Sequence, residues 1–155
     1  MIDLDKERIT DKMDDLEQCL RELEEYLPEE VDEYLGSGMR RRACERAFQL
    51  ACENLLDICN MIISDEGLGI PIDSKDAIQK LSQHNVISES LASRLEELTG
   101  FRNLLVHQYG RVDDSIAYRF LYSESGDFYE FLKEIERFIT SKIGASGEHQ
   151  SVTRD

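Results

Sequence analysis

The chain has 155 residues, 41% of them hydrophobic and 33% charged, which is ordinary for one globular domain with its own core. Its formal net charge of −15 at pH 7 argues against a general nucleic-acid binder, because phosphate backbones favour basic surfaces. No stretch approaches the roughly 18 continuous apolar residues of a membrane span, and the acidic, amphipathic N-terminus is not typical of a signal peptide. We therefore expect a cytoplasmic protein that does not associate with membranes.

The negative charge is concentrated at one end of the sequence. Residues 1–37 hold 14 acidic and 4 basic residues, a net charge of −10, whereas residues 38–143 have a net charge of only −4. A solvated helix face is the ordinary explanation of such an acidic segment. A basic cluster follows it at once and consists of Arg40, Arg41, Arg42 and Arg46.

Apolar spacing predicts two long helices in the first half of the chain. In the first, which Pro28 ends, apolar residues alternate spacings of three and four. They are Ile9, Met13, Leu16, Leu20, Leu23 and Leu27. After a short acidic connection over residues 29–38, a second helix is expected from about Met39 to Ser64. Its predicted buried face is Ala43, Ala47, Ala51, Leu55, Ile58 and Ile62.

Further helices are predicted after a loop at residues 65–73. Asp73 or Ser74 can cap a third helix that ends near Leu81, and Ser88 can cap a fourth. Gly100 interrupts the fourth helix at a cost of roughly 1 kcal/mol relative to alanine. A close helix crossing is the first explanation of this glycine, and room for a substrate backbone is the second.

The last segment, residues 113–143, predicts a short helix, a break at residues 123–126 and a final helix. No strand is evident, so we expect an all-α, up-and-down bundle of four to five helices. Residues 1–143 are expected to form this one domain. Residues 144–155 have no apolar periodicity and are expected to be a disordered tail.

The cysteines do not form a metal site by spacing. No two of them make a C-x-x-C pair, and none has a histidine at ligand spacing. We interpret Cys19, Cys44, Cys52 and Cys59 as reduced, mostly buried side chains, and we expect neither a bound metal nor a cofactor.

The polar groups best suited to chemistry lie in one window, Arg102-Asn-Leu-Leu-Val-His107-Gln-Tyr109. Histidine can exchange protons near neutral pH, and arginine offers a fixed fork of donors to a phosphate. On an ideal helix Arg102 and Tyr109 point almost the same way, whereas Arg102 and His107 diverge by about 140°. Therefore either the helix ends near His107, or another helix or a second subunit completes the site.

This window resembles the R-x-x-x-x-H-x-Y signature of the HepT-like branch of the HEPN superfamily, and the resemblance covers roughly residues 5–143. Asn103 fits because a polar residue commonly follows the arginine. The second predicted helix, Arg42-Ala-Cys-Glu-Arg-Ala-Phe-Gln-Leu-Ala-Cys-Glu-Asn-Leu-Leu-Asp-Ile58, is also similar to that branch.

The resemblance implies a helical homodimer with the two signature helices near its two-fold axis and a composite cleft between them. It implies a metal-independent endoribonuclease toxin that cleaves RNA, with tRNA among the family's targets. It also implies a partner, a minimal nucleotidyltransferase antitoxin that silences the toxin by transferring AMP to the signature tyrosine, here Tyr109.

Site roles follow as hypotheses. Arg102 would bind the phosphate and His107 would act as general acid or base. Asn103 would orient His107 or the phosphate, and Tyr109 would contact substrate and accept the modification. The basic cluster is a weaker candidate for steering RNA: Arg40, Arg41, Arg42 and Arg46. The alternative function is a non-catalytic HEPN module that binds nucleotides or docks a nucleotidyltransferase.

Overall fold

The computed structural model describes residues 4–107 and 113–154. Over this part of the chain it contains helices and no strand, so the expected all-α fold is confirmed. Three short helices join four long ones, more elements than expected. The helices are α1 (Leu4–Tyr26), α2 (Val31–Leu35), α3 (Gly38–Glu66), α4 (Ser74–Gln83), α5 (Glu89–His107), α6 (Asp114–Glu124) and α7 (Gly126–Arg154).

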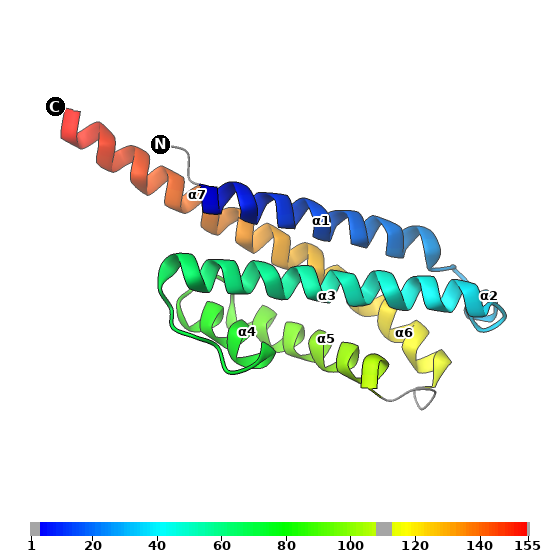
Figure 1. The fold of residues 1–155 in the computed structure, drawn as a ribbon. Helices are drawn as coiled ribbons and strands as arrows, with labels where there is room; N and C mark the ends of the chain where they lie inside the picture. Colours follow the sequence, from blue (N-terminus) through cyan, green and yellow to red (C-terminus); the bar gives the residue numbers. More distant parts are fainter. Residues whose placement is uncertain (1–3, 108–112, 155) are drawn as a thin grey trace.

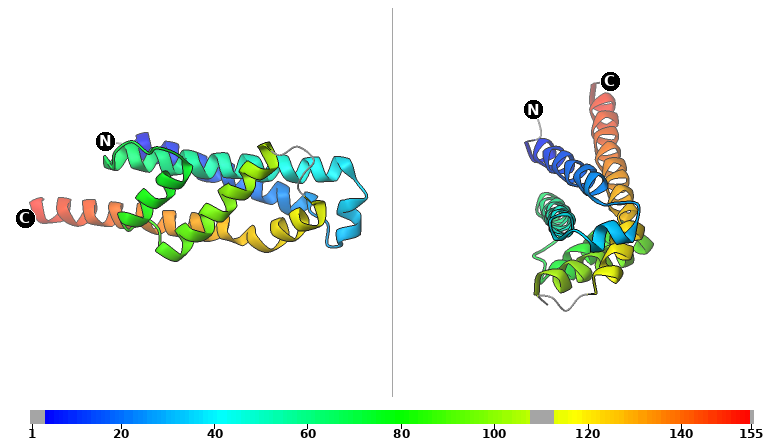
Figure 2. Two further views of the ribbon diagram at one scale, coloured as in Figure 1. Left: turned by 90° about the horizontal axis from the view of Figure 1, so that it is seen from below. Right: turned by 90° about the vertical axis from the view of Figure 1, so that its right-hand side faces the viewer.

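The long helices run up and down the bundle. Figure 1 shows α1 and α3 side by side in opposite directions, with α5 and α7 completing the bundle. The left view of Figure 2 shows α2 and α6 toward one end of the bundle, and the last described turns of α5 point toward that end. The α3–α4 loop lies toward the other end (Figure 1). The last described turns of α5 pack against α3 and α6.

The predicted helix starts are confirmed by their capping hydrogen bonds. The Asp73 side chain accepts from the backbone N–H of Asp76 at 2.8 Å, and Ser88 Oγ accepts from that of Leu91 at 3.1 Å. These side chains satisfy N–H groups that have no partner inside the helix. At the end of α3, Gly67 adopts φ +64°, a left-handed conformation that glycine reaches without steric cost.

The predicted apolar faces form one core. On α1, Ile9, Leu16, Leu20 and Leu23 are buried, while Met13 and Leu27 pack partly buried against the same cluster. On α3 the expected face is buried except Ala43, which is half-buried. The four cysteines are free and buried, as expected. Burial raises the pKa of Cys44 to about 11 and that of Cys52 to about 12, which keeps both thiols protonated at neutral pH.

Helix α2 was not expected, since residues 29–38 were predicted to be only a connection. Tyr34 is fully buried and its ring lies 5.3 Å from that of Tyr118 on α6. The Tyr118 hydroxyl donates to the Pro28 carbonyl at 2.6 Å. These contacts join the α1–α2 connection to α6, so the short helix is stabilised by tertiary packing rather than by its own five residues.

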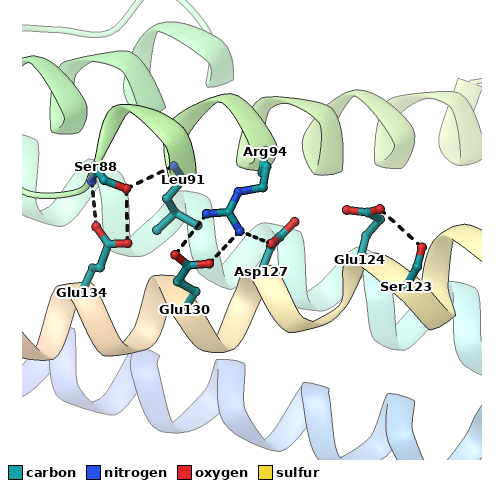
Figure 3. A network of polar contacts seen from close by, with 8 residues as sticks. All are labelled: Ser88, Leu91, Arg94, Ser123, Glu124, Asp127, Glu130 and Glu134. Carbon is teal, nitrogen blue, oxygen red and sulfur yellow. Dashed lines mark hydrogen bonds and ion pairs between the residues drawn. The ribbon is translucent and has the colours of Figure 1, made fainter.

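An ionic network fixes α5 against α7 (Figure 3). Arg94 Nη1 lies 2.6 Å from Asp127 Oδ1 and from Glu130 Oε2, and its Nη2 donates to Glu130 Oε1 at 3.0 Å. Immediately before α5, the backbone N–H of Ser88 donates to Glu134 at 2.7 Å. The guanidinium lowers the pKa of Glu130 by hydrogen bonding. The network holds the register of the helix that carries the signature.

Two other expectations concern the ends of the chain and membranes. Helix α7 runs to Arg154, across the boundary expected at residue 143, and no helix end marks that boundary. That residues 144–155 form a disordered tail stays a prediction. In the described ranges, none of the helices has the combination of length and apolar character that crossing a membrane requires.

Candidate functional site

The signature occupies the last turns of α5. Arg102 and Asn103 lie within α5, whose described residues reach His107. The His107 side chain and Tyr109 lie outside the described residues. The site can therefore be built from Arg102, Asn103 and the side chains around them.

The Arg102 guanidinium points toward α3 and keeps 24% of its side chain exposed. Its Nη2 lies 3.7 Å from Glu53 Oε1, and its Nη1 donates to Asn103 Oδ1 at 3.2 Å. Among the described residues, Nε has no hydrogen-bond partner although it is buried. Arg102 is thus an accessible cation with part of its donor capacity unused, which suits it to an anionic ligand.

Phe101 anchors this end of α5 in the core. Its ring stacks on Phe120 of α6 at 4.0 Å and meets the edge of Phe48 of α3 at 5.7 Å. Because neighbouring residues on a helix point about 100° apart, burying Phe101 fixes the direction in which Arg102 leaves the helix. Aromatic packing thereby sets the position of the guanidinium.

The surroundings of Gly100 bear on its first explanation, a close helix crossing. Apart from its own helix, a Cβ at this position would meet no atom of the described residues within 4 Å, and the residue is exposed. None of the described helices of this chain crosses closely there, so a close crossing within the described residues is ruled out as the explanation. Leu104, one turn further, is 43% exposed and continues the same face. Gly100 and Leu104 are thus exposed on this face of α5, as far as the described residues extend.

The basic cluster divides into two pairs. Arg41 donates from Nη1 to the Tyr34 and Leu35 carbonyls, and its Nε lies 3.5 Å from Asp114 Oδ2. It ties α2 to α6, and this structural use leaves it less suited to RNA steering. Arg40 lies 3.8 Å from Glu33, an exposed contact of little energetic value.

Arg42 and Arg46 are exposed on α3. They precede Glu53 by eleven and seven residues, about three and two helical turns, so the three residues share one face of α3. That face is the one that meets Arg102. Glu53 was not among the site residues predicted from the sequence, although its spacing from Arg42 and Arg46 was the signal that relates it to the cluster.

No metal cluster is formed in the described part of the chain, where no group of three or more histidine, cysteine, aspartate or glutamate side chains is suitably placed. This finding does not extend to residues 108–112. The expectation of chemistry without a metal therefore stays a prediction.

Comparison with known proteins decides the family. Residues 16–135 match the family described as Ribonuclease HepT-like, and this range contains Arg102, His107 and Tyr109. The chain belongs to the HepT-like family. The resemblance drawn from the signature is confirmed.

Named relatives of this HepT-like chain are nucleases. It is 34% identical over 88 residues to an mRNA nuclease HepT of Shewanella oneidensis, covering 57% of this chain and 66% of that protein. It is 24% identical over 109 residues to a tRNA nuclease HepT of Aphanizomenon flos-aquae, covering 70% and 74%. The chain thus spans about two thirds to three quarters of their lengths.

A solved structure shares the fold. The tri-AMPylated HEPN toxin of Shewanella oneidensis, solved in complex with MNT antitoxin, matches with a TM-score of 0.78 at 26% identity. The match covers 83% of this chain and 96% of that one. Sequence and structure together therefore show the HepT-like fold for this chain.

Proposed function

We propose that this HepT-like protein is a metal-independent endoribonuclease toxin acting on RNA, with tRNA as the expected target. The observation that carries the proposal is Arg102, a partly exposed guanidinium with unused donors, five residues before His107 at the end of α5. Relatives named mRNA and tRNA nucleases support RNA as the substrate class.

The chemistry assigns one step to each residue. A histidine removes the proton of the ribose 2′-hydroxyl, whose oxygen attacks the adjacent phosphorus and displaces the 5′-oxygen. An acid protonates that leaving oxygen, so the products end in a 2′,3′-cyclic phosphate and a 5′-hydroxyl. Arg102 stabilises the growing phosphate charge, His107 transfers protons, and Asn103 orients His107 or the phosphate.

A homodimer supplies the second proton-transfer group. The reaction uses a base and an acid, and each signature holds one histidine. On an ideal helix a residue seven positions after Gly100, as His107 is, has nearly the same helical phase as Gly100, whose face Leu104 shares. Pairing this face with its own copy would bring two signatures together in one composite cleft.

The formal charge of −15 does not contradict this proposal, because most of it comes from residues 1–37. The side of α3 that meets Arg102 instead carries the exposed Arg42 and Arg46. These two arginines remain candidates for steering RNA into the cleft. Arg40 and Arg41, which have contacts within the chain, contribute less.

Cleavage of total RNA in EDTA tests the function. We expect the wild type to produce discrete fragments ending in a cyclic phosphate, and His107→Ala to produce none, because one proton transfer is lost. Fragment ends are identified by their resistance to phosphatase until acid opens the cyclic phosphate. Cleavage that requires an added divalent metal would contradict metal independence. Intact RNA with an unmodified wild type would favour the non-catalytic docking module instead.

Regulation is proposed at Tyr109. The related toxin solved with MNT antitoxin is tri-AMPylated, and an AMP group near Arg102 would repel RNA and block the cleft. Incubation of the purified protein with a minimal nucleotidyltransferase and ATP is expected to add AMP to Tyr109 and abolish cleavage. Peptide mass spectrometry locates the group. Tyr109→Phe, which lacks the acceptor oxygen, should remain unmodified, and modification elsewhere with full inhibition would refute this assignment.

A further inference from the structure

Glu53 of α3 faces the proposed phosphate-binding group directly. Its Oε1 lies 3.7 Å from Arg102 Nη2, and its side chain is 41% exposed. Within the described residues it is the carboxylate that forms an ion pair with Arg102. The Glu53 carboxylate therefore lies beside Arg102 Nη2, in a position that an RNA phosphate would have to take in order to bind this nitrogen.

The resting hydrogen bonds of Arg102 are incomplete. Asn103 Oδ1 accepts from Nη1, but the Glu53 contact is too long for a strong hydrogen bond, and the buried Nε has no partner. A buried donor without a partner is costly. A partly exposed ion pair adds little stability, corresponding to about fivefold or less in an equilibrium constant. The resting contact is therefore weak enough to exchange.

A phosphate offers what this resting state lacks. Nε and Nη2 lie on the same side of the guanidinium fork, which can bind two oxygens of one phosphate at once. These are the two guanidinium nitrogens to which Asn103 makes no hydrogen bond. Because Nε is buried at rest and Nη2 faces Glu53, the guanidinium has to shift before both nitrogens can reach one oxyanion.

We propose that Glu53 is a positioning residue that holds the Arg102 guanidinium inward in the RNA-free protein and is replaced by an RNA phosphate when substrate binds. This inference rests on the proposed ribonuclease function and deepens it. Glu53 does not touch the reacting atoms. Glu53 determines the position of the Arg102 guanidinium in the RNA-free protein. Part of the RNA-binding free energy is then used to break the Glu53–Arg102 ion pair.

The test is binding of a fluorescein-labelled, fully 2′-O-methylated RNA, which lacks the attacking hydroxyl. Fluorescence anisotropy is measured with the full chain at low and high salt. Glu53→Gln keeps the shape of the side chain but removes its charge. We expect it to bind about two- to fivefold more tightly at low salt, with the gain shrinking at high salt because salt screens partly exposed ion pairs.

Asp57→Asn is the matched control. Asp57 lies one turn further along α3 and pairs with Lys12 at 3.2 Å, so this variant also removes one carboxylate and breaks one ion pair. It leaves the Arg102 contact intact. A gain as large as that of Glu53→Gln would show only a general effect of charge and would overturn the proposal.

A double-mutant cycle separates positioning from local structure. In an Arg102→Ala background, Glu53→Gln should no longer tighten RNA binding beyond the Asp57→Asn value, because its effect acts through the missing guanidinium. Unchanged tightening in that background overturns the proposal. Glu53→Ala, with folding checked by circular dichroism, should show the same dependence on Arg102.

Cleavage by the wild type distinguishes a failure of the positioning role of Glu53 from a failure of the proposed ribonuclease function. If the wild type cleaves RNA and the Glu53 variants bind like the wild type, the positioning role alone fails. If the wild type neither cleaves nor binds RNA, the proposed ribonuclease function fails and the positioning role falls with it. Tighter binding that depends on Arg102, in a protein that cleaves RNA, supports both.

Discussion

Replacing Arg102 by alanine is expected to lower the rate of RNA cleavage by about a hundred- to a thousandfold, the usual effect of removing one donor that stabilises transition-state charge. Folding should be nearly unaffected. The side chain is 24% exposed, its ion pair with Glu53 is weak, and truncation removes the buried Nε that has no partner. The measurement is single-turnover cleavage of RNA in EDTA, with the melting temperature recorded for each variant.

Two further variants sharpen this result. Arg102→Lys keeps the charge but loses the planar fork, so its rate should fall between the wild type and Arg102→Ala. Arg119→Ala removes an exposed arginine from neighbouring α6 and should cleave at nearly the wild-type rate. Equal losses for Arg102→Ala and Arg119→Ala would mean that general charge, and not a defined phosphate contact, controls activity.

The sequence was sufficient for the long helices because their signals are local. Apolar periodicity located α1 and α3, and the Asp73 and Ser88 caps located the starts of α4 and α5. Helix α2 was not predicted, because five residues are too few to show a periodic apolar pattern. Its stability comes from Tyr34 packing on Tyr118, which lies 84 residues away in the chain.

The candidate site divides in the same way. Arg102, Asn103 and His107 were found because they fall within one eight-residue window that resembles a known signature. Glu53 was not found, since nothing in the sequence separates this carboxylate from the other acidic residues, 33 in all. Only the packing of α3 against α5 shows that it contacts Arg102. Gly100 was misjudged for a related reason, because a sequence does not show whether a glycine faces the same chain or open space.

The largest stability effect is expected from Phe48→Ala. Phe48 of α3 is 1% exposed, and its ring lies 5.7 Å from Phe101, 6.3 Å from Phe120 and 5.8 Å from Phe128. Truncation removes edge-to-face contacts with three helices and leaves a cavity among them. The free energy of unfolding should fall by about 3–5 kcal/mol, a large part of the roughly 5–15 kcal/mol typical of a small domain.

Urea unfolding followed by circular dichroism measures this change, with Tyr122→Ala as the control. Tyr122 is an exposed aromatic residue on α6, and its loss should change stability by less than about 1 kcal/mol. Because Phe101 leans on Phe48 immediately before Arg102, folded Phe48→Ala should also cleave RNA more slowly than Tyr122→Ala. A Phe48→Ala protein that is strongly destabilised yet, where folded, cleaves at the wild-type rate would show that Arg102 is positioned without the aromatic cluster. Placement of the guanidinium would then rest on the Arg94 network with Asp127 and Glu130 and on the contact with α3.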